Sequence, residues 1–64
     1  MKWTDVRQIA ENLYDLHPEV DPKTINFVEL HNKIVSLPDF DDDHRRGGEK
    51  VLEAIQLAWI EESE

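Results

Sequence analysis

The feature that most constrains this chain is its small size combined with a complete absence of cysteine. Its 64 residues make at most one domain. A domain of that size buries only about 60% of the surface that its unfolded chain exposes. Without cysteine, neither a disulfide nor a thiolate-bound metal can add stability. We therefore expect residues 1–64 to form a single domain of low folding free energy.

Apolar residues recur at helical spacing in three segments, and this pattern predicts an all-α fold. The first segment spans residues 4–16, with Thr4 as a suitable N-cap. The second spans residues 26–36, and the third spans residues 49–62. Prolines follow the first two segments and prevent the helices from continuing. Three short helices with a loop before the last predict a compact, winged-helix-like domain related to the helix-turn-helix motif.

The expected core consists of one apolar stripe from each helix together with the aromatic residues. We expect Phe40 to enter the core from the loop and His31 to lie on an apolar helix face. Leu57 and Ile60 fall outside the stripe of the third helix, and we expect them to widen its buried face. The aromatic residues predicted to be in the core are Trp3, Phe27, Phe40 and Trp59.

The strongly acidic composition excludes several classes of function. Fifteen acidic residues against seven lysines and arginines give a formal net charge of −8, which repels nucleic acid and anionic lipid and attracts cations and basic protein surfaces. Neither a signal peptide nor a membrane span is recognisable, so we expect a cytoplasmic monomer. No cysteine, phosphate-binding glycine loop or nucleophile with a histidine partner is present, so we expect no enzyme activity.

The densest group of acids lies in residues 39–43, Asp-Phe-Asp-Asp-Asp. Carboxylates suit hard cations, but His44 stands where a calcium loop of EF-hand type needs glycine. Two interpretations stay open: a weak cation site, or a solvated acidic loop without a specific ligand. Because crowded carboxylates repel one another, removing the charge of Asp42 is expected not to destabilise the fold. The candidate metal ligands are Asp39, Asp41, Asp42, Asp43, Glu49 and Glu53.

Five stretches of the sequence, in this order and spacing, resemble the IscX family of small acidic proteins in bacterial iron–sulfur cluster assembly. The most specific are the acidic stretch 39–43 and the segment 49–59, which reads EKVLEAIQLAW. The sequence departs from the family after the acidic stretch, where proline and a serine or similar helix cap are usual and His-Arg-Arg-Gly-Gly stands here. The other matching stretches are Lys-Trp-Thr-Asp at 2–5, Leu-Tyr-Asp at 13–15 and Asp-Pro-Lys-Thr at 21–24.

The resemblance implies a winged-helix-like fold and a role as an adaptor or regulator that binds the cysteine desulfurase of the assembly machinery. It also implies weak binding of iron through surface acids. The alternative is a generic acidic protein-interaction module without a metal function, whereas the charge opposes a DNA-binding regulator. The residues expected to contact the partner are Asp39, Asp41, Asp42, Asp43, Glu49, Glu53, Glu11 and Asp15.

Overall fold

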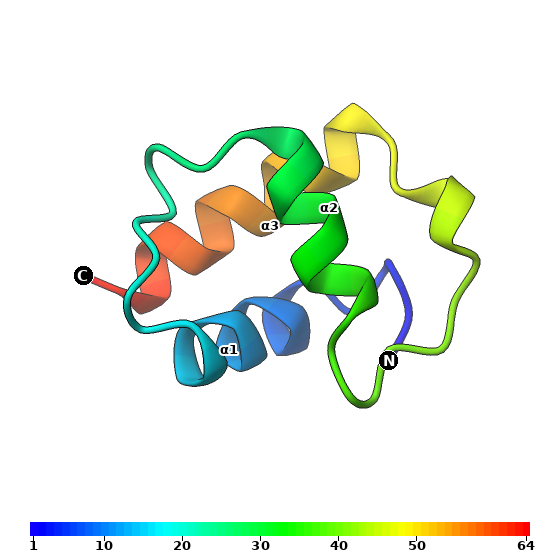
Figure 1. Ribbon diagram of the computed structural model, residues 1–64, viewed down its shortest axis with the longest axis horizontal. Coiled ribbons are helices and arrows are strands. Elements are labelled where there is room, and N and C mark those ends of the chain that lie inside the picture. The colour runs from blue at the N-terminus through cyan, green and yellow to red at the C-terminus, as the bar shows by residue number, and fades with distance from the viewer.

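The computed structural model describes residues 1–64 and contains three α-helices and one short 3₁₀ turn (Figure 1). The helices are α1 (Val6–Leu16), α2 (Phe27–Val35) and α3 (Glu49–Glu62), and the turn η1 (His44–Arg46) precedes α3. The expected all-α single domain is confirmed. The winged-helix detail is not confirmed, because a wing is a β-hairpin and the chain forms no strand.

Helix α1 begins one residue later than the sequence suggested. Thr4 is not its N-cap; Asp5 occupies that position and makes no side-chain capping bond. The Asp5 carboxylate instead accepts a hydrogen bond from the backbone N–H of Lys2 at 2.8 Å, which closes a turn before the helix. The helix ends at Leu16, as expected from Pro18 two residues later.

The ends of α2 and α3 agree closely with the sequence pattern. The Asn26 side chain caps α2 by accepting from the backbone N–H of Glu29 at 2.9 Å. Glu29 in the first turn and Lys33 in the last turn both suit the helix dipole. Gly48 is the N-cap of α3 and offers no side-chain bond, so this helix begins without the cap that serine would provide.

The core lies where the three helices meet, and α1 packs most extensively against α3. Trp59 of α3 is only 1% exposed, and Trp3 is buried from outside the helices. Phe27 and Phe40 are half-buried and pack against this cluster. The buried apolar residues are Trp3, Ile9, Ala10, Leu13, Ile25, Leu30, Ile34, Leu37, Leu52, Ile55, Ala58 and Trp59.

Some residues expected in the core face solvent instead. Leu57 is 57% exposed, so the prediction that it widens the buried face of α3 is wrong, whereas Ile60 is half-buried. Leu16 is half exposed at the end of α1. Leu57 is exposed because Leu52, Ile55 and Trp59 already supply the face that α3 turns inward. None of the helices combines the length and apolar character that crossing a membrane requires.

Candidate functional site

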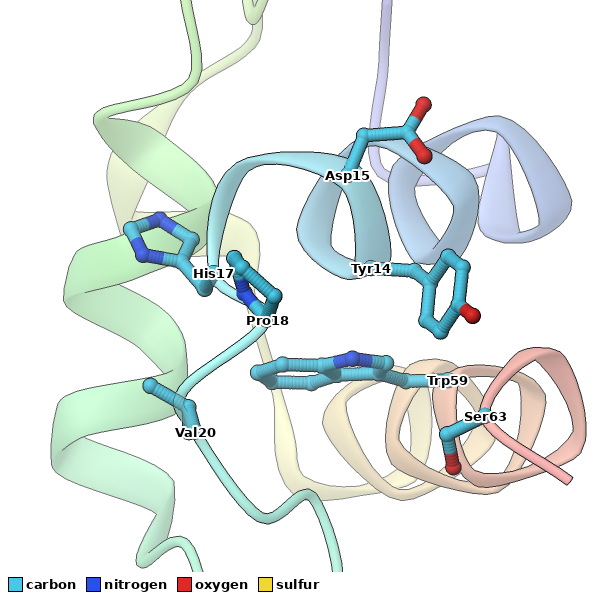
Figure 2. A pocket seen from close by; sticks show the side chains of 7 residues that line it. All are labelled: Tyr14, Asp15, His17, Pro18, Val20, Trp59 and Ser63. Carbon is cyan, nitrogen blue, oxygen red and sulfur yellow. The ribbon is translucent and has the colours of Figure 1, made fainter.

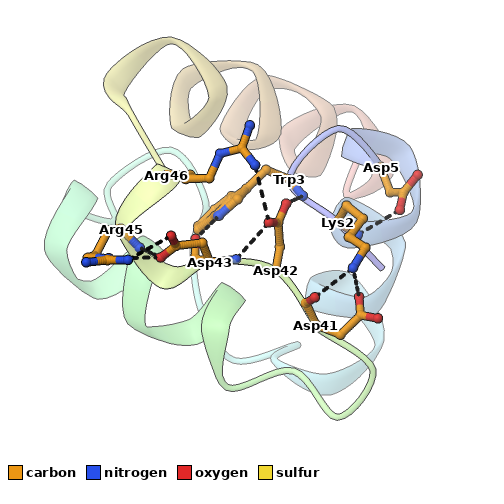
Figure 3. A network of polar contacts seen from close by, with 8 residues as sticks. All are labelled: Lys2, Trp3, Asp5, Asp41, Asp42, Asp43, Arg45 and Arg46. Atoms are coloured by element: carbon orange, nitrogen blue, oxygen red, sulfur yellow. Dashed lines mark hydrogen bonds and ion pairs between the residues drawn. The ribbon is translucent and has the colours of Figure 1, made fainter.

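The acidic stretch 39–43 is held against the first three residues of the chain (Figure 3). The backbone N–H of Asp41 donates to the carbonyl of Met1 at 3.0 Å. The backbone N–H of Trp3 donates to the Asp42 carboxylate at 3.1 Å, and its indole Nε1 donates to the carbonyl of Asp43 at 2.7 Å. Residues 39–48, called the acidic loop below, are therefore anchored by main-chain and side-chain bonds across nearly 40 residues of sequence.

Asp42 is the central anchor of the acidic loop. Its side chain is only 17% exposed and accepts hydrogen bonds from the backbone N–H groups of Trp3 and Asp43. These two donors lower the pKa of the Asp42 carboxyl below its usual range. These bonds argue against the prediction that removing the Asp42 charge leaves the fold equally stable, because two otherwise unpaired N–H groups depend on its carboxylate.

The neighbouring aspartates have cationic partners. The N-terminal ammonium lies 3.1 Å from the Asp41 carboxylate and Lys2 Nζ lies 3.4 Å from it, and together they lower its pKa. The side chain and backbone N–H of Arg45 both donate to Asp43 and lower the pKa of that carboxyl. Most of the expected repulsion within the acidic stretch is thus offset inside the molecule.

Aromatic side chains pack against the acidic loop. The ring of Phe40 packs edge-on against Trp3 with centroids 4.8 Å apart, so its predicted anchoring role is confirmed. His31 of α2 stacks on Trp3 with ring centroids 5.5 Å apart and donates from Nε2 to the carbonyl of His44 at 2.6 Å. Gly47 lies so close to Trp3 that a Cβ atom there would stand 2.5 Å from the ring.

The remaining predicted metal ligands do not complete a metal cage. Asp39 has no ion-pair or hydrogen-bond partner for its carboxylate, and Glu49 and Glu53 are exposed one turn apart at the start of α3. No group of three or more Asp, Glu, His or Cys side chains is arranged to hold a metal ion. The six-residue iron site therefore stays a prediction, and a rigid site with several protein ligands is not preformed.

Glu11 and Asp15 are the two candidate partner-binding residues outside this region. Both are exposed on α1, four residues apart, and so share one helix face. The C-terminal end of α1 and the acidic loop lie at opposite ends of the molecule's long axis (Figure 1). The structure therefore divides the predicted contact residues between two separate regions of the surface.

Comparison with known proteins agrees with this architecture. A family model described as iron–sulphur cluster assembly matches residues 1–64. The chain belongs to this family. It is also 61% identical over 62 residues to an uncharacterized protein of Pseudomonas aeruginosa, and the match covers 97% of this chain and 94% of that protein. Membership confirms the resemblance stated from the sequence and points to a role in iron–sulphur cluster assembly.

Sequence reasoning missed the residues that hold the acidic loop in this member of the family. Lys2 and Trp3 contribute backbone and side-chain bonds to it, and His31 contributes one from α2. Trp3 and Phe40 were expected in the core, but nothing in the linear sequence pairs them with each other. The one available signal was that Lys-Trp at 2–3 and the acidic stretch 39–43 both belong to the pattern of the same family.

Proposed function

We propose that this protein is a non-catalytic, cytoplasmic adaptor that binds the cysteine desulfurase of the iron–sulphur assembly machinery through its acidic surface. The observation that carries the proposal is a rigidly anchored acidic loop on a protein of net charge −8 in an iron–sulphur assembly family. Fixing an acidic surface in advance reduces the ordering cost of binding a complementary basic surface.

The structure distinguishes the acids that are free for a partner from those used within the fold. Three of the four loop aspartates have internal cationic partners, whereas the Asp39 carboxylate has none. Exposed acids without ion pairs also lie on α1 and α3. We assign the main electrostatic contact to these unpaired acids, which are Asp39, Glu49, Glu53, Glu11 and Asp15. Asp41, Asp42 and Asp43 contribute chiefly by holding the loop in place.

Iron enters the proposal as a weakly bound cargo. Asp39, Glu49 and Glu53 are the predicted ligands that remain without internal partners, and carboxylates discriminate poorly among hard divalent cations. With few protein ligands, a bound ion keeps much of its water shell. We therefore expect weak, unselective binding of ferrous iron near the start of α3.

The decisive experiment titrates purified desulfurase into the labelled protein at increasing ionic strength. Between about 0.1 M and 1 M salt the screening length falls from about 10 Å to about 3 Å. We expect affinity to fall steeply over this range, with a slower association rate. The double variant Glu49→Gln and Glu53→Gln should bind more weakly, whereas Glu29→Gln on α2 changes the charge outside the proposed surface and serves as control.

Two results would overturn the proposal. Absence of desulfurase binding at low salt would leave a generic acidic interaction module, and salt-independent affinity would indicate an apolar contact centred on Leu57. For the cargo, a ferrous titration should broaden or shift resonances around Glu49 and Glu53 and be displaced by excess magnesium. A tight response that magnesium does not displace would contradict an unselective carboxylate site.

A further inference from the structure

The end of the molecule opposite the acidic loop contains a hollow, and of its lining residues only Asp15 belongs to the proposed adaptor surface. It has a volume of about 360 Å³, is lined by the end of α1, the connector after it and the end of α3, and is seen closely in Figure 2. Its size is near the lower limit of about 300 Å³ for small-ligand pockets, which suits one long side chain or a small molecule. The lining residues are Tyr14, Asp15, His17, Pro18, Val20, Trp59 and Ser63.

The walls of the hollow combine aromatic and polar groups. In Figure 2 the indole of Trp59 forms the floor beneath the rings of Tyr14 and Pro18. Trp59 is almost completely buried, whereas Tyr14 is 45% exposed and offers both a ring face and a hydroxyl group. Asp15 also lines the hollow on α1, and in Figure 2 its carboxylate points away from Trp59. The hollow therefore offers the exposed ring of Tyr14 to a side-chain stem, and it lies at a helix end that carries the negative charge of Asp15.

The C-terminal end of α1 adds to this negative potential. Because Pro18 has no N–H and the chain then turns away, no backbone N–H donates to the carbonyls of Tyr14, Asp15 and Leu16. The last turn of α1 contains no basic residue, and Asp15 adds a negative charge at the negative end of the helix dipole.

The C-terminal end of α3, in contrast, has a basic side chain of the chain beside it. Arg7 of α1 places its guanidinium 3.0 Å from the Glu62 carboxylate and 3.3 Å from that of Glu61. These two acids raise the pKa of Arg7. The chain thus supplies a guanidinium to the end of α3, while no such group reaches the end of α1. No lysine or arginine of the chain forms an ion pair with Asp15, so a cation that complements this helix end would come from another molecule.

We propose that this hollow receives an arginine side chain of a partner protein, at a second contact separate from the acidic loop. A guanidinium group can stack on the exposed ring of Tyr14, and the acceptors at the same helix end are the free carbonyls and the Asp15 carboxylate. An ammonium group lacks the planar face and the divergent donors, so arginine is preferred to lysine. The net charge of −8 favours such a basic partner over an anionic one.

The indole resonances of the two tryptophans provide the test, because Trp59 lines the hollow and Trp3 contacts the acidic loop. A capped Gly-Arg-Gly peptide is titrated into the nitrogen-15-labelled protein, beside matched peptides containing lysine or the neutral isostere citrulline. We expect the Trp59 indole resonance to shift in a saturable way with millimolar arginine peptide, more weakly with lysine and hardly with citrulline. The Trp3 resonance should stay in place.

Matched variants separate the hollow from bulk charge. Asp15→Asn should weaken arginine-peptide binding about three- to fivefold, whereas Glu11→Gln removes the same charge one turn earlier and should have little effect. Thermal melts of both variants check that these exposed substitutions leave the fold intact. Equal weakening by the two variants, equal binding of citrulline, or a linear unsaturated shift at both tryptophans would each refute the proposal. The peptide assay contains no desulfurase, so failure of the proposed adaptor function would leave this inference standing.

Discussion

The contact between Gly47 and Trp3 leads to a sharp prediction about what holds the acidic loop in place. A Cβ atom at Gly47 would lie 2.5 Å and 2.6 Å from two carbons of the Trp3 ring and 3.0 Å from His31 Cδ2. Carbon atoms prefer separations of about 3.5–4.0 Å, so Gly47→Ala requires a displacement of about 1 Å. The φ angle of Gly47 is −80°, which alanine adopts readily, so the effect of the substitution is steric rather than conformational.

The displacement is costly because Trp3 is fixed on several sides. Its ring is 4% exposed, its indole donates to Asp43 and its backbone donates to Asp42. Overpacking of this kind typically costs about 1–3 kcal/mol. For a domain of this size that corresponds to a fall in Tm on the order of 5–20 °C. Thermal and urea unfolding followed by circular dichroism measure the loss, and the Trp3 indole resonance reports the displaced ring.

Gly48→Ala is the matched control for this substitution. No atom lies within 4 Å of a Cβ built at Gly48, and its backbone is extended at the N-cap of α3. Alanine is a poorer N-cap than glycine, but it also lowers the entropy of the unfolded chain, so the two effects nearly cancel. If Gly47→Ala is as stable as Gly48→Ala and leaves the Trp3 resonance unchanged, the packing described for the acidic loop is incorrect.

Three further predictions concern the core and the pH dependence of stability. Trp59→Ala should unfold the domain or nearly do so, because truncating a buried tryptophan costs about 3–5 kcal/mol. The free energy of unfolding of the Leu57→Ala variant should stay within about 0.5 kcal/mol of that of the parent protein, because Leu57 is exposed. Similar melting curves for the two variants would contradict the burial described. Asp42→Asn should lower the urea midpoint, whereas Asp39→Asn, which removes an unpaired carboxylate, should not. A lower midpoint for Asp39→Asn than for Asp42→Asn would show that Asp42 does not anchor the acidic loop. The folded state lowers the pKa of the three paired aspartates below the unfolded value of about 3.9, so it binds fewer protons in acid. Their stabilisation should therefore be complete above about pH 5 and be lost progressively as the pH falls below about 4 toward the lowered pKa values of the folded state. The loss should be smaller in Asp42→Asn, and a urea midpoint unchanged from about pH 6 to pH 3 would refute the prediction.

The helices were accessible from the sequence because their signals are local. Apolar residues three and four positions apart, followed by Pro18 and Pro38, define α1 and α2 within about two residues. The start of α1 was misplaced because Asp5, and not Thr4, is the N-cap residue, and its carboxylate bonds to the backbone of Lys2 rather than to the first turn of the helix. The exposure of Leu57 was not predictable either, since a helix with apolar residues on several faces does not reveal which face its neighbours cover.

The sequence by itself determined the all-α class, the acidic character and the family to which the chain belongs. Only the tertiary structure decided which acids are free. Residues 39–43 read as a run of repelling charges, because the backbone donors of Trp3 and the cation of Lys2 are nearly 40 residues away in the chain. Hydrogen bonds and ion pairs depend on distances of about 3–4 Å in space, and sequence separation carries no information about such distances until the chain has folded.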